Sequence, residues 1–453
     1  MLAVPAPCRP PANVADGRTR AAPPAPDLPP RPLRWLFLDL NSYFASVEQQ
    51  LQPSLRGRPV IVAPVGSDTT VAIAASIEAK RFGIGTGTPV WEAKQKCREL
   101  VVTPARHDRY VEFHDRIVAE VWRHLPVTRV CSIDEVACRL LDNENDREGV
   151  VALAHRIKAG IRANVGDYLS CSIGIAPNRL LAKLASDLQK PDGLVVFEAA
   201  QLPQDLYALK LRDICGIGAK MERRLARDGV NDIRQYCERR PRDAGNAWGG
   251  VDGDRLWYLL HGIDLPDKPT QSRTIGHSHV LSPSKRGLEP ARLTARRLAL
   301  KAASRLRRKG YRARLLILHA RFEDDKSAWR TSIKLPVTGD SFVVLQHLDA
   351  LFPRLREAGR LRPGGFRLRM IGVTLAEIEP VGGDQGSLFA HLDPSDPLAR
   401  ETRGFALSQA MDRINERFGR NAVSVGPLNG GRLDRVGTKI AFGRIPEPGE
   451  FHE

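Results

Sequence analysis

The chain has 453 residues, long enough for several domains of about 100–150 residues each. Its hydrophobic content of 42% is typical of a globular protein, but its formal net charge of +17 is not. A field of that sign attracts polyanions, so the expected partner is nucleic acid or an anionic membrane surface. No apolar run approaches the roughly 20 residues that span a bilayer, which favours nucleic acid.

The seven cysteines are scattered, odd in number and never spaced as C-x-x-C. We therefore expect neither a disulfide framework nor a zinc site, and a reducing, cytoplasmic environment. Residues 1–33 are rich in Pro, Ala and Arg and lack the apolar core of a secretory signal. We interpret them as a disordered leader.

Hydrophobic spacing predicts a core layer in the first half of the chain. Buried strands are predicted at 35–39 and 58–64, and helices at 72–82 and 109–125. Two strands within 127–141 flank a tight turn at Asp134 and Glu135, and a helix at 150–165, a strand at 168–175 and a helix at 178–189 follow. Strands that alternate with long helices indicate an α/β or α+β layer.

The pattern changes after Gly193. Residues 206–236 are predicted to be helical, with an interruption at Gly216-Ile-Gly218. Residues 262–270 have the composition of a linker. Residues 274–377 predict a second mixed unit in the order strand, basic helix, strands, helix, strand, and a polar tail follows in which residues 405–418 have helical periodicity.

Three carboxylates lie at the ends of apolar strands: Asp39 after the first strand, and Asp134 and Glu135 at the later turn. Burying such charges without a partner is costly, so either they reach solvent as strand-end or capping residues, or they bind a hard cation. Mg²⁺ takes oxygen ligands, commonly one or two carboxylates together with substrate phosphates. Two such ions can clamp the attacking and leaving oxygens of a phosphoryl transfer.

Four segments decide between these readings. Residues 37–48 (FLDLNSYFASVE), 132–135 (SIDE), 172–178 (SIGIAPN) and 181–193 (LAKLASDLQKPDG) resemble, in order and spacing, the palm motifs of Y-family DNA polymerases, most closely the bacterial DinB type. The resemblance covers residues 34–380. It implies an α+β multidomain fold shaped as a right hand: palm at 34–42 and 104–198, small fingers at 43–103, helix–hairpin–helix thumb at 199–266, α/β little finger at 271–380 and tail at 381–453.

The resemblance also implies roles for residues around the carboxylates. Asp39 and Asp134 match the ligands that bridge two Mg²⁺ ions, and Glu135 matches the third carboxylate, with the backbone carbonyl of Leu40 as a further ligand. Phe44, beside Tyr43, matches the steric gate that excludes a ribonucleotide 2′-OH. Without the family context, it would be read as an ordinary core aromatic.

The triphosphate side of the motif set is only partly kept. Lys190 matches a lysine that reaches the triphosphate, although a surface lysine at a helix C-terminus is the plainer reading. In the fingers, the family usually supplies Thr, Tyr and Arg where this chain has Ala74, Ile77 and Lys80. Ala and Ile side chains cannot hydrogen-bond, and Lys lacks the bidentate fork of Arg. We expect weakened nucleotide binding and a raised KM for dNTP, with Arg81 or a residue elsewhere as the candidate for compensation.

Two further features predict a grip on DNA. Gly216 and Gly218, followed by Lys220, resemble a helix–hairpin–helix in which backbone amides meet a phosphate. Residues 285–314 carry about a dozen basic residues against the single acid Glu289, which predicts a phosphate-neutralising face rather than a merely solvated helix. We select from it Arg296, Arg297, Lys301 and Arg305.

The segment Gln385-Gly-Ser-Leu388-Phe389 resembles a sliding-clamp binding peptide, although a match of five residues can arise by chance. Together these features predict a monomeric, template-directed DNA polymerase of low fidelity that acts on primer-template DNA and dNTPs in translesion repair. The alternative is a catalytically weak, polymerase-like accessory that acts through the sliding clamp. A nucleotidyl cyclase would share the palm layout, but the thumb motif and the basic unit argue against it.

Overall fold

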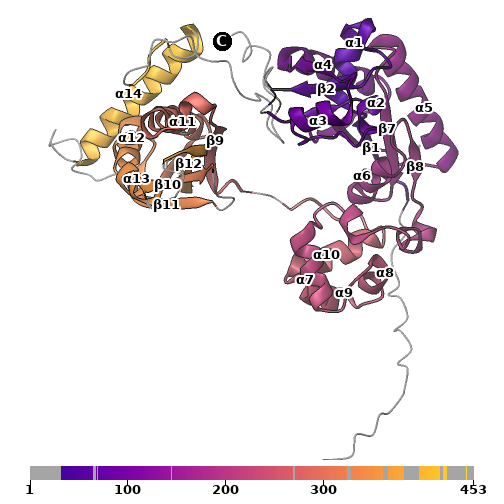
Figure 1. Ribbon diagram of the computed structural model, residues 1–453. Helices are drawn as coiled ribbons and strands as arrows, with labels where there is room; N and C mark the ends of the chain where they lie inside the picture. Colours follow the sequence, from indigo (N-terminus) through magenta and orange to yellow (C-terminus); the bar gives the residue numbers. More distant parts are fainter. Residues whose placement is uncertain are drawn as a thin grey trace, which may run out of the picture. The chain divides into compact units, whose positions relative to one another are not determined.

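The computed structural model describes residues 32–418, with gaps at 65–67, 69, 144, 269–270, 324–327, 361–365 and 382–396, and also residues 422–425 and 445. The described chain forms two compact units that divide between Pro266 and Asp267, inside the stretch read as a linker (Figure 1). None of the helices in the described ranges has the length and apolar character needed to cross a bilayer. The predicted α+β multidomain architecture is confirmed.

A five-stranded sheet forms the centre of the first unit. Its strand order is β5 (Val127–Val130), β6 (Glu135–Arg139), β1 (Trp35–Leu40), β7 (Cys171–Ala176) and β8 (Leu194–Val196). Strand β1 is antiparallel to both neighbours, and only β7 and β8 run parallel. Leu36 and Leu38 are fully buried, whereas Phe37 and Asp39 share the other face because strand residues alternate. The sheet is flanked by α4 (His107–Trp122), α5 (Arg147–Asn164) and α6 (Arg179–Leu188).

Helix α6 packs unusually closely against the face that carries Phe37 and Asp39. A Cβ atom at Gly174, on β7, would lie 2.1 Å from the carbonyl oxygen of Ala182 and 2.4 Å from the amide nitrogen of Ser186. Only glycine therefore permits this approach. At the helix N-terminus, the Asn178 side chain accepts a hydrogen bond from the amide of Leu181 at 3.0 Å, which caps the first turn. The sequence thus fixes both where α6 begins and how deeply it sits.

A smaller layer follows β1 in sequence. It contains α1 (Tyr43–Leu51) and a three-stranded sheet of β3 (Ala74–Ala75), β2 (Val60–Ala63) and β4 (Val101–Pro104), with α2 (Ile77–Lys80) and α3 (Val90–Lys96). The helix predicted over 72–82 is wrong: the stretch is a short strand followed by a single helical turn. The amide of Ile73 bonds to the carbonyl of Val62, and Ser76 caps α2, so sheet pairing overrides the helical propensity of the alanines.

The first unit ends in a helical group comprising α7 (Ala219–Arg227), α8 (Ile233–Cys237), α9 (Pro241–Trp248) and α10 (Val251–Leu260). Its side chains share one apolar core with Phe37 and α6. The helix predicted across 206–236 is shorter than expected, because residues 204–206 and 211–213 form only 3₁₀ turns and Gly229 adopts a positive φ that ends α7.

The second unit is a four-stranded antiparallel sheet in the order β11 (Trp329–Thr338), β10 (Tyr311–Phe322), β12 (Leu368–Pro380) and β9 (Thr274–Val280). Its helices include α11 (Leu288–Arg308), α12 (Ser341–Asp349) and α13 (Phe352–Arg360), of which α13 was not expected. Helices α11 and α12 cover one face of the sheet and build a single core with it.

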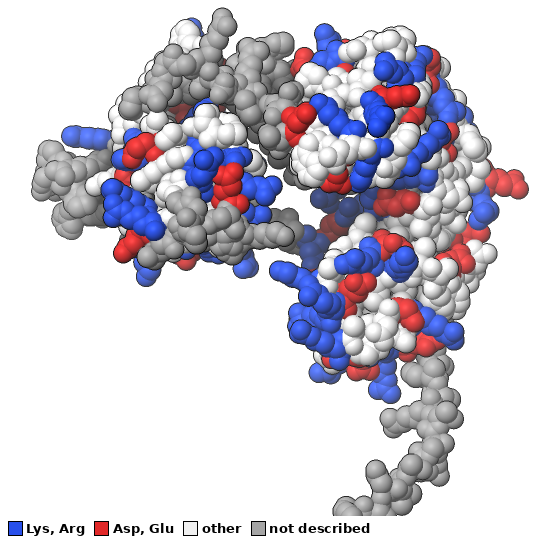
Figure 2. All heavy atoms as spheres, in the orientation of Figure 1, with Lys and Arg blue, Asp and Glu red and all other residues white. Residues whose placement is uncertain are grey.

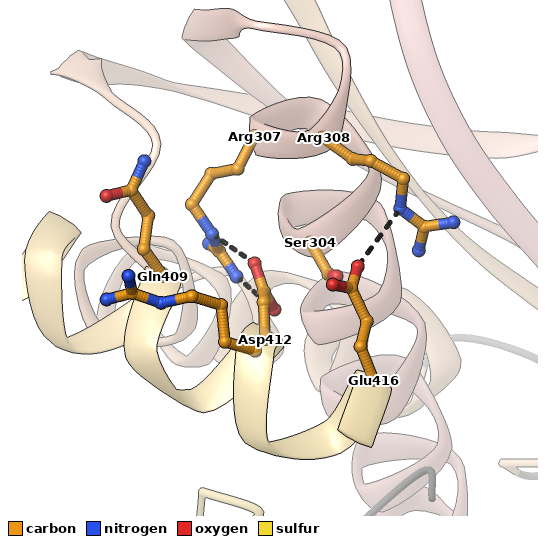
Figure 3. Close-up of a pocket in the computed structure, with 7 residues that line it drawn as sticks. Ser304, Arg307, Arg308, Gln409, Asp412 and Glu416 are labelled. Carbon is orange, nitrogen blue, oxygen red and sulfur yellow. Dashed lines mark hydrogen bonds and ion pairs between the residues drawn. The ribbon is translucent and has the colours of Figure 1, made fainter.

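Part of the predicted polar tail is a structural element of the second unit. Helix α14 (Pro397–Phe418) packs on α11 and α12. Its Asp412 receives a bidentate ion pair from the buried Arg307 guanidinium at 2.8 and 2.9 Å, and Glu416 lies 3.9 Å from Arg308 (Figure 3). The helix predicted over 405–418 is thus confirmed, and it begins eight residues earlier, at Pro397.

Candidate active site

The antiparallel pairing of β1 with β6 brings the three predicted carboxylates together. Asp39 lies directly opposite Glu135, and the amide of Leu40 bonds to the carbonyl of Asp134 at 2.9 Å. Asp134 is the last residue of the turn that leads into β6. Residues 95 apart in sequence are therefore neighbours because two short apolar strands align in this register.

Two lysine side chains neutralise Asp39, which is 6% exposed. The ammonium of Lys183, on α6, lies 2.6 Å from Oδ2 of Asp39 and 2.8 Å from Oε1 of Glu135. The ammonium of Lys190 lies 2.7 Å from Oδ1 of the same aspartate, and Asp187 contacts both lysines at 3.2 and 2.8 Å. These carboxylates hold the pKa of Lys190 above its ordinary value although burial alone would lower it.

Asp134 has a different environment. Burial raises its pKa, the hydrogen bond from the Ser132 hydroxyl acts in the opposite sense, and the charges of Asp39 and Glu135 raise it further. The three carboxylates are therefore mutually unfavourable when ionised, and a cation placed among them relieves that repulsion.

The donor set fits a hard divalent cation, since carboxylate oxygens are the ligands that Mg²⁺ prefers. In this arrangement, however, no three acidic, His or Cys side chains of the described ranges converge as a ready metal cage. The ammonium of Lys183 instead contacts both Asp39 and Glu135. These two carboxylates thus already share one cation, the Lys183 ammonium, as they would share a metal ion.

The predicted gate residues lie in an aromatic cluster at the start of α1. Tyr43 is buried and donates its hydroxyl hydrogen bond to the carbonyl of Tyr110 at 2.6 Å. Phe44 is half-buried and stacks on the Tyr110 ring, with centroids 4.3 Å apart and planes inclined by 12°. Ser42, in the turn after β1, has a φ of +50°, a left-handed conformation uncommon outside glycine. The turn places Phe44 five residues beyond Asp39, on the helix that follows it.

Lys190 is carried on a loop held from two sides. Asn41 accepts a hydrogen bond from the amide of Asp192 at 2.8 Å. The buried ammonium of Lys158 donates to the carbonyls of Asp192 and Gly193 at 2.6 and 2.9 Å. These contacts fix the loop backbone and leave the Lys190 side chain 36% exposed beside Asp39.

Ala74 and Lys80, two of the residues that depart from the family's usual triphosphate ligands, have defined places in the structure. Ala74 lies in β3 opposite Val62 and is nearly buried, so its side chain packs against the layer. Lys80 lies at the end of α2 near the carboxylates: burial lowers its pKa, Lys190 lowers it further, and Asp39 acts in the opposite sense. Arg81 follows as the C-cap residue of α2. Lys80 and Lys190 therefore place two cationic side chains near Asp39.

The glycines of the predicted helix–hairpin–helix precede α7. Gly216 has a φ of +98°, which a side chain would strain, and Gly218 is the N-cap residue of α7. Lys220 is the second residue of that helix and is exposed. The local geometry is the one that presents backbone amides to an anion.

The basic helix of the second unit is less one-sided in space than in sequence. Asp349 of α12 pairs with Arg296 and, at 3.1 Å, with Arg292. Further along, Asp412 and Glu379 pair with Arg307 and Arg314. Acidic residues distant in sequence thus neutralise part of this charge. Acidic and basic side chains are likewise mixed on the visible surface of both units (Figure 2). Arg297, Lys301 and Arg305 also lie on α11, the helix that covers the core face of the sheet.

Sequence reasoning missed two groups of residues. Lys183 lies within the motif at 181–193, but the sequence alone indicated no role for it; its spacing of four residues from Asp187 was the available signal. The second group lies on β10 and β11: Arg321, Arg330 and Lys334 are exposed, while their neighbours Phe322, Trp329, Ile333 and Leu335 pack in or on the core. Alternation of basic and apolar residues in WRTSIKL could have identified this basic sheet face.

Comparison with known proteins places the whole arrangement in one family. Residues 38–187 match the impB/mucB/samB family, and residues 272–388 match that family's C-terminal domain. The chain is 35% identical to DNA polymerase IV of Moorella thermoacetica, over 87% of this chain and 98% of that protein. It is 30% identical to DNA polymerase IV of Pelotomaculum thermopropionicum, over 86% and 93% of the two chains.

Among solved structures, a Y-family DNA polymerase chimera has a similar fold, with a TM-score of 0.62 at 23% identity, covering 76% of this chain and 99% of that one. The second family match begins at residue 272, close to the division between the two compact units at Pro266 and Asp267. The chain therefore belongs to the impB/mucB/samB family, as a DinB-type member of the Y-family DNA polymerases.

Proposed function

We propose that this DNA polymerase extends a primer by nucleotidyl transfer with two Mg²⁺ ions, at low fidelity, in translesion synthesis during DNA repair. The observation that carries the proposal is the strand register that makes Asp39, Asp134 and Glu135 neighbours beside two lysine side chains. Asp39, Asp134 and Glu135, with the carbonyl of Leu40, would hold the ions. When bound, these would activate the primer 3′-OH and neutralise the triphosphate.

The chain's own side chains have complementary tasks in this reaction. Lys190, with Lys80 and Arg81, binds the triphosphate and orients its α-phosphorus toward the 3′-OH. Pyrophosphate leaves as the new phosphodiester bond forms. Phe44, stacked on Tyr110, lies under the sugar and excludes a 2′-OH, with Tyr43 fixed behind it.

DNA would be held by both units. The amides around Gly216 and Gly218, with Lys220, would take a backbone phosphate without reading sequence. In the second unit, the exposed sheet face with Arg321, Arg330 and Lys334 is the better candidate for the duplex than α11, because α11 faces the core and part of its charge is paired. Arg297, Lys301 and Arg305 would add to the field that attracts the DNA.

The clamp-binding peptide Gln385, Leu388 and Phe389 lies outside the described residues and is proposed on its sequence alone. We expect it to recruit a sliding clamp and so raise processivity without changing the chemistry. The polymerase itself is proposed to act as a monomer in the cytoplasm.

Primer extension on an undamaged template tests the proposal, with Mg²⁺, all four dNTPs and the Asp134→Ala variant as control. We expect extension by the natural chain, none by the variant, and similar DNA affinity for both. If the natural chain binds DNA but extends nothing even at millimolar dNTP, the proposal fails. The accessory function, favoured by Ala74 and Ile77 in the fingers, would then replace it.

A further inference from the structure

Lys183 is the most heavily engaged side chain of the site, yet it has no assigned role in the reaction. Its side chain is 18% exposed, and its ammonium lies within 2.6–3.2 Å of carboxylate oxygens of Asp39, Glu135 and Asp187. The ammonium also lies 5.2 Å from the centre of the Phe37 ring, an attractive cation–π position.

The position of Lys183 is imposed by the fold. Helix α6 approaches the sheet closely because β7 has Gly174 beneath it, and Phe37 and Asp39 occupy the facing positions on β1. The side chain therefore has little freedom to point elsewhere while α6 is docked. An ammonium among three carboxylates, those of Asp39, Glu135 and Asp187, offsets charge that would otherwise repel across the site.

The contacts of Lys183 coincide with those that a metal ion needs. Oδ2 of Asp39 and Oε1 of Glu135 belong to the carboxylates proposed above as metal ligands, and both oxygens are occupied by the same ammonium. A Mg²⁺ ion and this ammonium would compete for these oxygens, because two cations at short range repel each other. Lys190, by contrast, contacts Oδ1 of Asp39 and does not contact Glu135 in this way.

We propose that Lys183 is a built-in counter-cation, a positioning residue that holds Asp39 and Glu135 together before the metal binds and that Mg²⁺ displaces. The inference rests on the proposed metal site. It assigns Lys183 two opposing effects: it stabilises the metal-free protein, and it weakens Mg²⁺ binding by competition. The competition keeps the carboxylates preassembled until metal and nucleotide arrive together.

The test is a Mg²⁺ titration of thermal unfolding in the full chain, without DNA or dNTP. It compares the natural protein with Lys183→Met and Lys183→Arg. The Met variant should unfold at a lower temperature in EDTA, because it lacks the two charge-assisted contacts. For the same reason, the Mg²⁺ concentration that gives half-maximal stabilisation should be lower than in the natural protein by a factor of about ten. The Arg variant keeps the charge and should stay close to the natural protein.

Lys158→Met is the matched control. Lys158 is also buried, but it contacts carbonyls of the Lys190 loop and Asp192 rather than Asp39 or Glu135. This variant should unfold earlier at every Mg²⁺ concentration, with an unchanged midpoint of the Mg²⁺ effect. A purely structural role for Lys183 would give the same parallel pattern.

The outcomes separate the two proposals. If Mg²⁺ stabilises the natural protein and Lys183→Met leaves the midpoint unchanged or moves it to higher Mg²⁺, the counter-cation is wrong while the metal site stands. If Mg²⁺ at millimolar concentration does not stabilise the natural protein or any variant, the metal site itself is wrong, and the inference falls with it. If Lys183→Met fails to fold in EDTA but folds in Mg²⁺, the proposal is supported. If Lys183→Met folds under neither condition, Lys183→Gln is used in its place, and the midpoint of its Mg²⁺ titration decides in the same way.

Discussion

The buried carboxylate of Glu48, behind the proposed sugar gate, allows a quantitative prediction. Glu48 lies on α1 and is fully buried; it accepts hydrogen bonds from the Arg106 guanidinium, with Nε 3.1 Å from both oxygens, and from the Tyr110 hydroxyl at 2.8 Å. Tyr110 in turn stacks on Phe44. Burial and the charge of Glu48 raise the pKa of Tyr110, so its hydroxyl stays a donor at any ordinary pH.

We predict that Arg106→Met destabilises the first unit by about 3 kcal/mol. Removing one partner of a buried ion pair costs ~3–5 kcal/mol because the remaining charge is left uncompensated. The lower end applies because the Arg106 side chain is 36% exposed, so water can enter beside Glu48. The double variant Glu48→Met/Arg106→Met should recover much of the loss, since two apolar groups leave no unpaired charge.

The effect is measured by urea unfolding of the natural chain, the single variants Glu48→Met and Arg106→Met, and the double variant. Ribonucleotide incorporation is a second readout. Arg106→Met should also admit more ribonucleotides, because Tyr110 loses its fixed support behind Phe44. Tyr110→Phe keeps the stacked ring and should keep the sugar selectivity despite losing one hydrogen bond. An Arg106→Met variant as stable as the natural chain, or a double variant as unstable as the two single losses combined, would refute this account of the gate's support.

Four further results are expected. Phe44→Ala should raise ribonucleotide incorporation at least tenfold in single-nucleotide insertion assays; unchanged sugar selectivity would remove it as the gate. Asp134→Asn should abolish extension and raise the unfolding temperature of the metal-free protein near neutral pH. Because burial raises the pKa of Asp134, the folded protein loses stability as the pH rises through that raised value and the carboxyl group ionises. The neutral amide of the variant does not ionise, so the variant keeps that stability. The KM for dNTP should be high and should rise further in Lys80→Ala; an ordinary micromolar KM that survives that change and loss of the Arg81 side chain contradicts our view of the fingers. Deletion of residues 385–389 should remove stimulation by the sliding clamp but not basal extension, and equal stimulation of both proteins would exclude the peptide.

The local sequence pattern was sufficient to locate the site residues that lie at the ends of predicted strands. Apolar strands that end in Asp39 and begin at Glu135 are visible without a fold, because alternation and strand length are local properties. The motif order identified the family, and the element order of the second unit, apart from the additional helix α13, followed from hydrophobic spacing. The helix predicted over 72–82 failed because strand pairing with β2, a non-local contact, outweighs the helical propensity of alanine.

The tertiary structure decided which charges meet. Lys183 reaches Asp39 across 144 residues only because Gly174 lets α6 sit close to the sheet. Arg296 and Arg307 looked like free basic residues of one helix, yet Asp349 and Asp412, distant in sequence, neutralise them. A sequence counts charges along the chain, whereas Coulomb energy depends on distance in space, and that distance is fixed by packing.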